Sequence, residues 1–411
     1  MSILAAFLVP HPPMIVPQIG RGSEEQVLET IRAYEQVADE IASLRPETIL
    51  ISSPHATMYA DYFHISPGRA ARGSFASFGV PDISFLETYD EEIVRRIDSL
   101  AREWHVEAGM LGETDPLLDH GTMVPLWFIR QKYNDFKIVR IGLSGLPLAD
   151  HYKLGMLIRE VVEATGRKAV FVASGDLSHK LQEYGPYGFA PEGPQYDREL
   201  MDVCARGAFG ELLDFDEGFC DRAAECGHRS FVIMAGTMDA QSVRANALSH
   251  QDVTGVGYGI CTFYPEGPDE SRHFLNQYLK KWSYEMSGDE YVKLARKSLE
   301  SYILRGETID VPEDLPPEML QKRAGAFVSI HKFGKLRGCI GTIMATTDSV
   351  AREIIENAIS ASTRDPRFDP IEAGELQYLE INVDVLSEPE EIGSMDELDV
   401  KKYGVIVSCG A

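Results

Sequence analysis

Short apolar runs alternate with longer amphipathic segments through the first two-thirds of the chain. The runs Ile3–Val9, Thr48–Ser52 and Ala169–Ser174 have the length and composition of buried strands. After the first run, Ser23 and Gln26 have capping-box spacing, which predicts a helix start. The apolar positions of that helix fall on one face, at Val27, Ile31, Tyr34, Ala38 and Ile41. Such alternation predicts an α/β fold with αβα layers, in which helices cover both faces of a mostly parallel sheet.

The pattern changes at the Pro- and Gly-containing run Tyr264–Asp269, which is typical of a break between domains. We therefore expect a first domain over residues 1–264, a linker over 265–275 and a second, α+β domain over 276–411. The predicted elements of the second domain are a helix at Tyr291–Leu304, a Pro-rich loop at Val311–Pro317 and strands at Ala326–His331, Leu379–Leu386 and Val405–Ser408.

Size and charge narrow the class of protein. A chain of 411 residues exceeds what one hydrophobic core usually supports, which favours two domains. With 39 Lys and Arg against 64 Asp and Glu, the net charge of −25 disfavours nucleic acid and anionic membranes as partners. No apolar run is long enough to span a bilayer, and Met1–Val9 lacks the basic start of a signal peptide. The six cysteines form no CxxC pair, so we expect free thiols and a cytoplasmic location.

Each of the three predicted strands runs into a turn that carries a histidine. His11 lies between prolines, His55 follows Ser53-Pro54, and His179 ends the segment Gly175–His179. The carboxyl ends of parallel strands meet at one edge of a sheet, so these imidazoles can converge. Two such histidines and a carboxylate would form the facial triad of non-haem Fe(II) enzymes. A single histidine of this kind more often only bonds locally, but a converging set favours a metal site.

The third ligand is open on the residues alone. Glu225 and Cys226 are adjacent and precede an apolar segment predicted as a helix, Ser230–Met238. Glu225 would complete an iron triad, whereas Cys226 is a softer ligand suited to zinc or copper. Alternatively, Glu225 only stabilises the helix N-terminus electrostatically.

Two further residues of the first domain are candidates for proton transfer and substrate orientation. Histidine side chains in general titrate near neutral pH, so His179 is a candidate acid or base, and Asp176 three residues earlier is placed to orient it. His120, predicted in a loop before an apolar helix, would orient a substrate or bond to backbone. The other histidines that we considered are expected to be structural or on the surface: His64, His105, His151, His250 and His273.

The second domain contains one unusual cysteine. Cys339 lies between glycines, two residues after Arg337, which would suit a reactive thiolate in a positive turn. A tight hairpin with a small buried cysteine explains the same residues and is slightly favoured. Arg364 and Arg367 flank a Pro-fixed turn, where they would bind an anion or pair with neighbouring acids.

The first-domain motifs resemble the class III extradiol dioxygenase superfamily of the LigB type, and its Memo-like branch most closely. The motifs that carry the resemblance are Val9–Pro13, Ser53–His55, Asp119–Thr122, Ser174–His179 and Glu225–His228. The resemblance implies Fe(II) bound by His11, His55 and Glu225, which makes Glu225 our preferred third ligand. It also implies an active-site histidine at His179 and a substrate-pocket histidine at His120. In the Memo-like branch a cysteine can replace the third ligand, which would be Cys226 here.

The second domain resembles the AMMECR-type domain through the run Leu336–Gly341 and the strand near Leu379–Ser387. That domain normally continues further, so we expect this chain to be truncated. The two domains together resemble the fused form of the AmmeMemoRadiSam system, which implies a radical SAM protein as partner.

These observations predict a metal-dependent, Fe(II) extradiol-dioxygenase-like oxidoreductase that takes a small, aromatic or catecholic substrate and O₂. Two other functions stay open: a non-catalytic adaptor that binds a metal or peptide, and a zinc or copper site that uses Cys226. A homo-oligomer is compatible with the sequence, and no residue pattern identifies the substrate.

Overall fold

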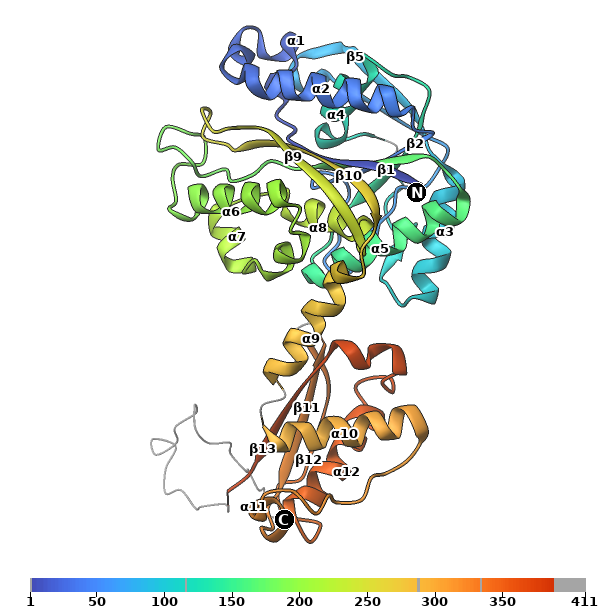
Figure 1. The fold of residues 1–411 in the computed structure, drawn as a ribbon, viewed down its shortest axis with the longest axis vertical. Coiled ribbons are helices and arrows are strands. Elements are labelled where there is room, and N and C mark those ends of the chain that lie inside the picture. Colours follow the sequence, from blue (N-terminus) through green and yellow to red (C-terminus); the bar gives the residue numbers. More distant parts are fainter. Residues whose placement is uncertain (1, 115–116, 287–288, 333–334, 388–411) are drawn as a thin grey trace, which may run out of the picture. The chain divides into compact units, whose positions relative to one another are not determined.

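The computed structural model describes residues 2–114, 117–286, 289–332 and 335–387 (Figure 1). The chain divides into two compact units, Met1–Tyr278 and Leu279–Ala411. We describe each unit by itself.

The first unit is built on a six-stranded sheet with the order β7-β2-β8-β1-β10-β9. Four neighbouring strands, β7, β2, β8 and β1, are parallel, and β10 joins β1 in the antiparallel sense. The strands are β1 (Ile3–Val9), β2 (Thr48–Ser53), β7 (Lys137–Gly142), β8 (Ala169–Ser174), β9 (Gln241–Gln251) and β10 (Tyr258–Pro268). The three strands predicted from apolar runs are therefore confirmed, and β8 lies between the other two.

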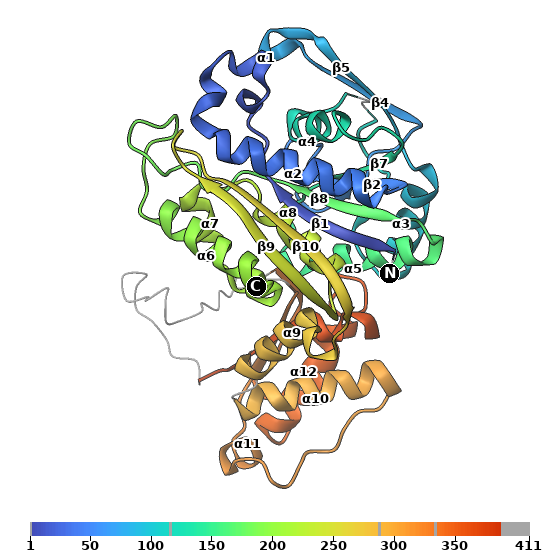
Figure 2. The same ribbon diagram turned by 45° about the horizontal axis from the view of Figure 1, so that its top comes forward.

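Helices cover both faces of this sheet (Figures 1 and 2). One face carries α2 (Leu28–Leu44) and α4 (His120–Arg130), and the other carries α5 (Leu148–Thr165) and α8 (His228–Thr237). Successive residues of β1 are buried on both faces, as expected for a covered parallel sheet. The αβα layering is thus as predicted. The other elements of this unit are α1 (Pro17–Gly20), β3 (Phe63–His64), β4 (Ala70–Phe75), β5 (Val80–Thr88), α3 (Glu91–Glu103), β6 (Ala108–Gly109), α6 (Glu192–Arg206) and α7 (Glu217–Ala223).

Two local predictions for this unit are wrong. No capping box forms at Ser23, because Ser23 starts a 3₁₀ turn and its hydroxyl donates to the carbonyl of Gly20 at 2.6 Å. The predicted linker also begins too early, since β10 continues to Pro268 and pairs with β9 along its whole length. The register shifts between Pro265 and Gly267, so the Pro- and Gly-containing run is an irregularity within a hairpin. Helix α9 (Phe274–Met286) then starts inside the segment expected to be a linker.

The second unit has a three-stranded antiparallel sheet, with the order β12-β11-β13. Its strands are β11 (Ala326–Lys332), β12 (Lys335–Gly341) and β13 (Leu379–Val385), and its helices are α10 (Glu290–Arg305), α11 (Pro317–Gln321) and α12 (Val350–Thr363). Ala326, Val328 and Ile330 of β11 share one apolar core with residues of α10 and α12. This small α+β arrangement agrees with the prediction. The strand expected at Val405–Ser408 lies outside the described residues.

Cys339 lies within β12, which forms a hairpin with β11, so the hairpin that the sequence slightly favoured is present and the alternative of a thiolate in a turn is not. The thiol is partly rather than fully buried. The glycine before Cys339 serves helix packing, because a Cβ on Gly338 would lie 2.2 Å from the carbonyl oxygen of Ala361 in α12. The Cys339 thiol lies 3.2 Å from the Ser329 hydroxyl on β11. Its backbone amide donates to Asp365 at 2.8 Å.

The arginines near this cysteine are paired with acids. Arg337 makes a bidentate contact with Glu375, with Nε and Nη2 at 3.0 and 2.9 Å from the carboxylate oxygens. Arg367 is bidentate to Asp365 at 2.9 and 2.7 Å. Both guanidinium groups thus complete local ion pairs, which was the alternative to anion binding for Arg367.

Candidate metal centre

Three neighbouring strands deliver the polar residues of the centre. His11, His55 and Asp176 each follow the last residue of their strand by two positions, after β1, β2 and β8. Because β8 lies between β2 and β1, the three turns are adjacent at one edge of the sheet. His11 and His55 therefore converge as expected, and the third turn brings Asp176 to this edge, three residues before His179.

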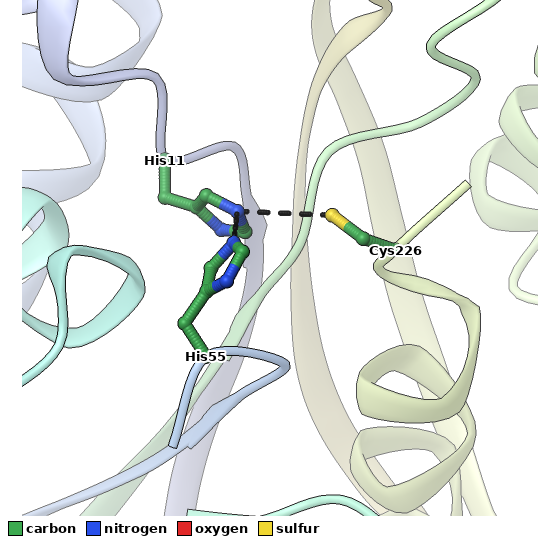
Figure 3. Close-up of side chains that lie close together, drawn as sticks. All are labelled: His11, His55 and Cys226. Carbon is green, nitrogen blue, oxygen red and sulfur yellow. Dashed lines mark hydrogen bonds between the residues drawn. The ribbon is translucent and has the colours of Figure 1, made fainter. Parts of the chain in front are cut away.

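Two imidazoles and one thiol face each other at this edge (Figure 3). The Nε2 atoms of His11 and His55 lie 3.0 Å apart, and the Cys226 sulfur lies 3.7 Å from His11 Nε2. One donor atom from each residue lies within 4.8 Å of the others. Donor atoms that share one ion at metal–ligand distances of about 2.0–2.3 Å are roughly 3–3.7 Å apart. The donor set therefore fits a single transition-metal ion.

The tautomer of His11 follows from its hydrogen bonds. The Ser174 hydroxyl donates its proton to the carbonyl of Gly121 at 2.6 Å, and it lies 3.0 Å from His11 Nδ1. A hydroxyl that has given away its proton can only accept, so Nδ1 carries the imidazole hydrogen. The Nε2 lone pair then faces His55 and Cys226, as a metal ligand requires.

The charge state of His55 also suits a ligand. Burial, together with the neighbouring imidazoles of His11 and His120, lowers the pKa of His55 to about 4. The ring is therefore neutral at physiological pH, which is the form that binds metals.

Cys226 reaches the centre because two backbone segments touch. A Cβ on Gly175 would lie 2.1 Å from the Cα of Gly227, so a side chain there would separate the turn after β8 from the start of α8. This approach lets the Asp176 amide donate to the Cys226 sulfur at 3.3 Å. Burial raises the pKa of the Cys226 thiol, and the carboxylates of Asp176 and Glu225 add to this effect.

Glu225, our preferred third ligand, points elsewhere. Its carboxylate accepts the backbone N–H of His228 at 2.6 Å, at the start of α8. Burial raises the pKa of Glu225 to about 7, while the His228 amide opposes that rise. Within the described ranges, both groups of candidate ligands contain Cys226 and neither contains Glu225. The geometry thus corrects the preference: Glu225 has the helix-terminus role that was its alternative, and α8 starts at His228 rather than at Ser230.

A second group of candidate ligands lies beside the first and shares Cys226. It consists of Asp176, His179 and Cys226. The Asp176 Oδ2 atom lies 3.8 Å from His179 Nε2 and 3.9 Å from His11 Nε2. Burial alone would raise the pKa of Asp176, but His11 and His179 hold that pKa below its usual value. Asp176 is thus a carboxylate placed between the two imidazoles.

His120 is the first residue of α4, not a loop residue before it, and its ring lies 4.0 Å from that of His55. Asp119 caps this helix by accepting from the Thr122 amide at 2.9 Å. The same carboxylate accepts from the Ser53 hydroxyl at 2.6 Å and pairs with Arg140 Nε at 3.2 Å. Asp119 therefore ties the turn that carries His55 to the helix that carries His120.

Several residues of the centre were missed from the sequence. Ser53 and Ser174 end β2 and β8, and a polar residue at the end of a buried strand was an available signal. Arg140 lies within β7, and no local pattern marks it. Tyr187, which stacks on His179, lies in a segment without helix or strand for which no sequence pattern predicts a role. The histidines interpreted as structural bond away from the centre, with His64 on Leu111, His151 on Pro147, His250 on Asp197 and His273 on Asp239.

Two known families match this chain, one over each of its domains. Residues 5–261 match the family described as the catalytic LigB subunit of aromatic ring-opening dioxygenase. Residues 292–411 match the AMMECR1 family. The chain therefore belongs to the LigB family and carries an AMMECR1 domain after its LigB-type domain.

Its relatives extend over one or both domains. A protein of Clostridium acetobutylicum, CA_C1420, is 40% identical over 421 aligned positions, which cover 100% of this chain and 90% of that protein. A protein of Thermotoga maritima is 50% identical over 121 residues, covering 29% of this chain and 70% of its own length. Among solved structures, an uncharacterized protein of Escherichia coli, JW3007, has a TM-score of 0.41 at 13% identity, covering 63% of this chain and 99% of its own. Among the residues that the structure describes, no helix has the length and apolar character needed to cross a membrane.

Proposed function

We propose that the first unit is a metal-dependent oxidoreductase in which His11, His55 and Cys226 hold one transition-metal ion. The observation that carries this proposal is the convergence of two imidazole nitrogens and a sulfur, at 3.0 and 3.7 Å, on the carboxyl edge of the sheet. Membership of the LigB family supports redox chemistry at this edge.

The types of the donor atoms indicate which metal ion the site would bind. Two imidazoles with a thiolate suit copper or zinc, whereas non-haem Fe(II) oxygenases use two histidines and a carboxylate. Zinc does not change its oxidation state, so redox chemistry on this set favours copper. Fe(II), which the resemblance of the sequence motifs implies, is the second candidate.

The residues around the donor set have separate roles in the proposed reaction. The bound ion would supply redox chemistry toward O₂ and a small aromatic substrate of the catechol type. His179, beside the Asp176 carboxylate, would accept or return the substrate proton, since an imidazole titrates near neutral pH. His120, against the ring of His55, would orient the substrate. A radical SAM enzyme is the proposed partner in the pathway, on the basis of the family resemblance.

Metal analysis of single variants tests the ligand set. Protein purified without added metal is compared with His11→Ala, Cys226→Ser and Glu225→Gln, and the bound metals are counted by mass spectrometry. We expect the first two variants to bind at least about 10-fold more weakly and Glu225→Gln to match the parent. Glu225 is a matched control because it is the neighbour of Cys226 in the same loop. Full occupancy in Cys226→Ser, or loss in Glu225→Gln alone, would refute the ligand set.

Oxygen uptake tests the reaction. The apo protein is loaded separately with copper and Fe(II), and O₂ consumption is followed with a panel of substituted catechols. Uptake that depends on the loaded metal and disappears in Cys226→Ser supports the proposal. A protein fully loaded with either metal that consumes no O₂ with any catechol would exclude the oxidoreductase and leave a metal-binding protein.

A further inference from the structure

The loop that follows His179 has a defined conformation and touches the centre. The Ala190 amide donates to the Lys180 carbonyl at 3.1 Å, which closes the loop on itself, and a β-bridge joins Leu181 to Phe189. The Leu181 amide also donates to Gly255 at 3.2 Å, in the turn between β9 and β10. The loop is therefore held at both ends and against a neighbouring turn.

Tyr187 is the residue of this loop that contacts the centre. Its ring stacks on the imidazole of His179, with centroids 5.0 Å apart and planes 22° from parallel. Tyr187 is nevertheless 60% exposed, so the stack is formed by one face of a ring that otherwise lies in solvent. Such an arrangement contributes little to a core and acts mainly on the imidazole beneath it.

Hydrogen bonding alone does not fix the His179 ring. Its polar partner among the described residues, Asp176 Oδ2, lies 3.8 Å away, which is too long for a hydrogen bond. The contact is electrostatic and weakly directional. The flat contact with Tyr187 therefore supplies a preferred plane for the imidazole that the distant carboxylate does not.

We propose that Tyr187 is a positioning residue, which holds the His179 ring so that its Nε2 atom points toward Asp176 and the metal donors. This inference rests on the proposed function for the role of His179, but the orientation itself is measurable without turnover. No pattern in the sequence predicts the contact between Tyr187 and His179.

The loop contains a matched control. Tyr184 is 74% exposed and its hydroxyl donates to the Val253 carbonyl at 3.3 Å. It belongs to the same loop and has the same side chain, but no ring contact with His179 is among its interactions. Tyr184→Ala therefore reports what loss of an exposed loop tyrosine does by itself.

Nuclear magnetic resonance of the full chain with labelled histidine tests the orientation. The His179 ring signals, assigned by their loss in His179→Gln, are compared between the parent, Tyr187→Phe, Tyr187→Ala and Tyr184→Ala. We expect Tyr187→Ala to move these signals by several tenths of a ppm, because the ring current of the stacked phenol is lost. Tyr187→Phe, which keeps the stack, and Tyr184→Ala should leave them near the parent. Unchanged His179 signals in Tyr187→Ala, or an equal shift in Tyr184→Ala, would overturn the proposal.

Kinetics on the metal-loaded protein provide the second measurement. A misplaced proton-transfer group should lower kcat by about 10-fold in Tyr187→Ala while KM changes little, and phenylalanine should restore kcat. An unchanged kcat would contradict the positioning role. If the NMR shift is present but the parent itself shows no turnover with any metal, the proposed function fails while the orientation by Tyr187 stands.

Discussion

Asp119→Asn should destabilise the first unit strongly although it changes one atom and leaves the shape of the side chain intact. In the parent protein, burial raises the pKa of Asp119, but Arg140, Ser53 and Thr122 together hold that pKa below its usual value. The side chains of Asp119 and Arg140 are only 9% and 6% exposed. The substitution therefore leaves a guanidinium buried without its counter-charge.

The size of the effect follows from these contacts. An asparagine oxygen can still accept from Ser53 or Thr122, so most of the loss comes from the ion pair. Breaking a buried pair by removal of one partner costs about 3–5 kcal/mol, chiefly through the uncompensated charge. A second change, Arg140→Met, removes that charge, so the double variant should recover at least about 1–2 kcal/mol relative to Asp119→Asn alone.

Urea unfolding at neutral pH, followed by tryptophan fluorescence, measures these differences. Trp104 and Trp127 both lie in the first unit, and Trp127 is on α4 itself. Metal titration of the same proteins should show binding weakened about 10-fold or more in Asp119→Asn, because the ion pair that holds residue 119 between Ser53 and Thr122 is lost. A loss of stability below about 1 kcal/mol, or a double variant in which the two losses simply add, would refute the reasoning.

Three further predictions concern single sites. Gly175→Ala should lower the free energy of unfolding by about 1–3 kcal/mol and weaken metal binding, because the new Cβ would collide with Gly227. Gly218→Ala is the control, because the nearest atom to its new Cβ would be 3.3 Å away. Equal metal affinity in the two variants would contradict this explanation. Burial lowers the pKa of His151 to about 3, so below pH 6.5 the unfolded chain takes up a proton that the native state does not. The free energy of unfolding, measured with urea, should thus fall by roughly 2–3 kcal/mol from pH 6.5 to 4.5, and it should depend less on pH in His151→Leu. The same pH dependence in parent and variant would contradict this explanation. Glu353 is 1% exposed, and its carboxylate accepts from three threonine hydroxyls and two amides. Glu353→Gln should therefore destabilise the second unit by about 2–4 kcal/mol, as measured by calorimetry. An unchanged unfolding transition would show that these hydrogen bonds do not stabilise the unit.

The sequence was sufficient for the elements that bury both faces. β1, β2 and β8 are continuous apolar runs, and each runs into a turn that carries a histidine. Their common direction predicts that His11, His55 and His179 lie at one edge of the sheet. The strand order was not predictable in this way, because the position of β8 between β2 and β1 depends on crossover connections that local patterns do not encode.

The choice between Glu225 and Cys226 shows the limit of such reasoning. Adjacent side chains leave the backbone in different directions, and the direction of each here depends on the left-handed conformation of Ala224, with φ +53°, and on where α8 begins. The glycines beside Cys339 left two interpretations open, a turn or a strand, for a related reason. A glycine needed for the close approach of a helix is indistinguishable in sequence from one needed for a turn.

The separation of the candidate metal ligands along the chain affects when the proposed metal site can form. His11 and Cys226 are 215 positions apart, although their donor atoms are neighbours in the folded unit. During synthesis at about 5–20 residues per second, the thiol is added roughly 10–40 s after the first imidazole. An ion captured earlier would be held by histidines alone, so loading of the complete site must follow the docking of α8 against the sheet on a nearly finished first unit.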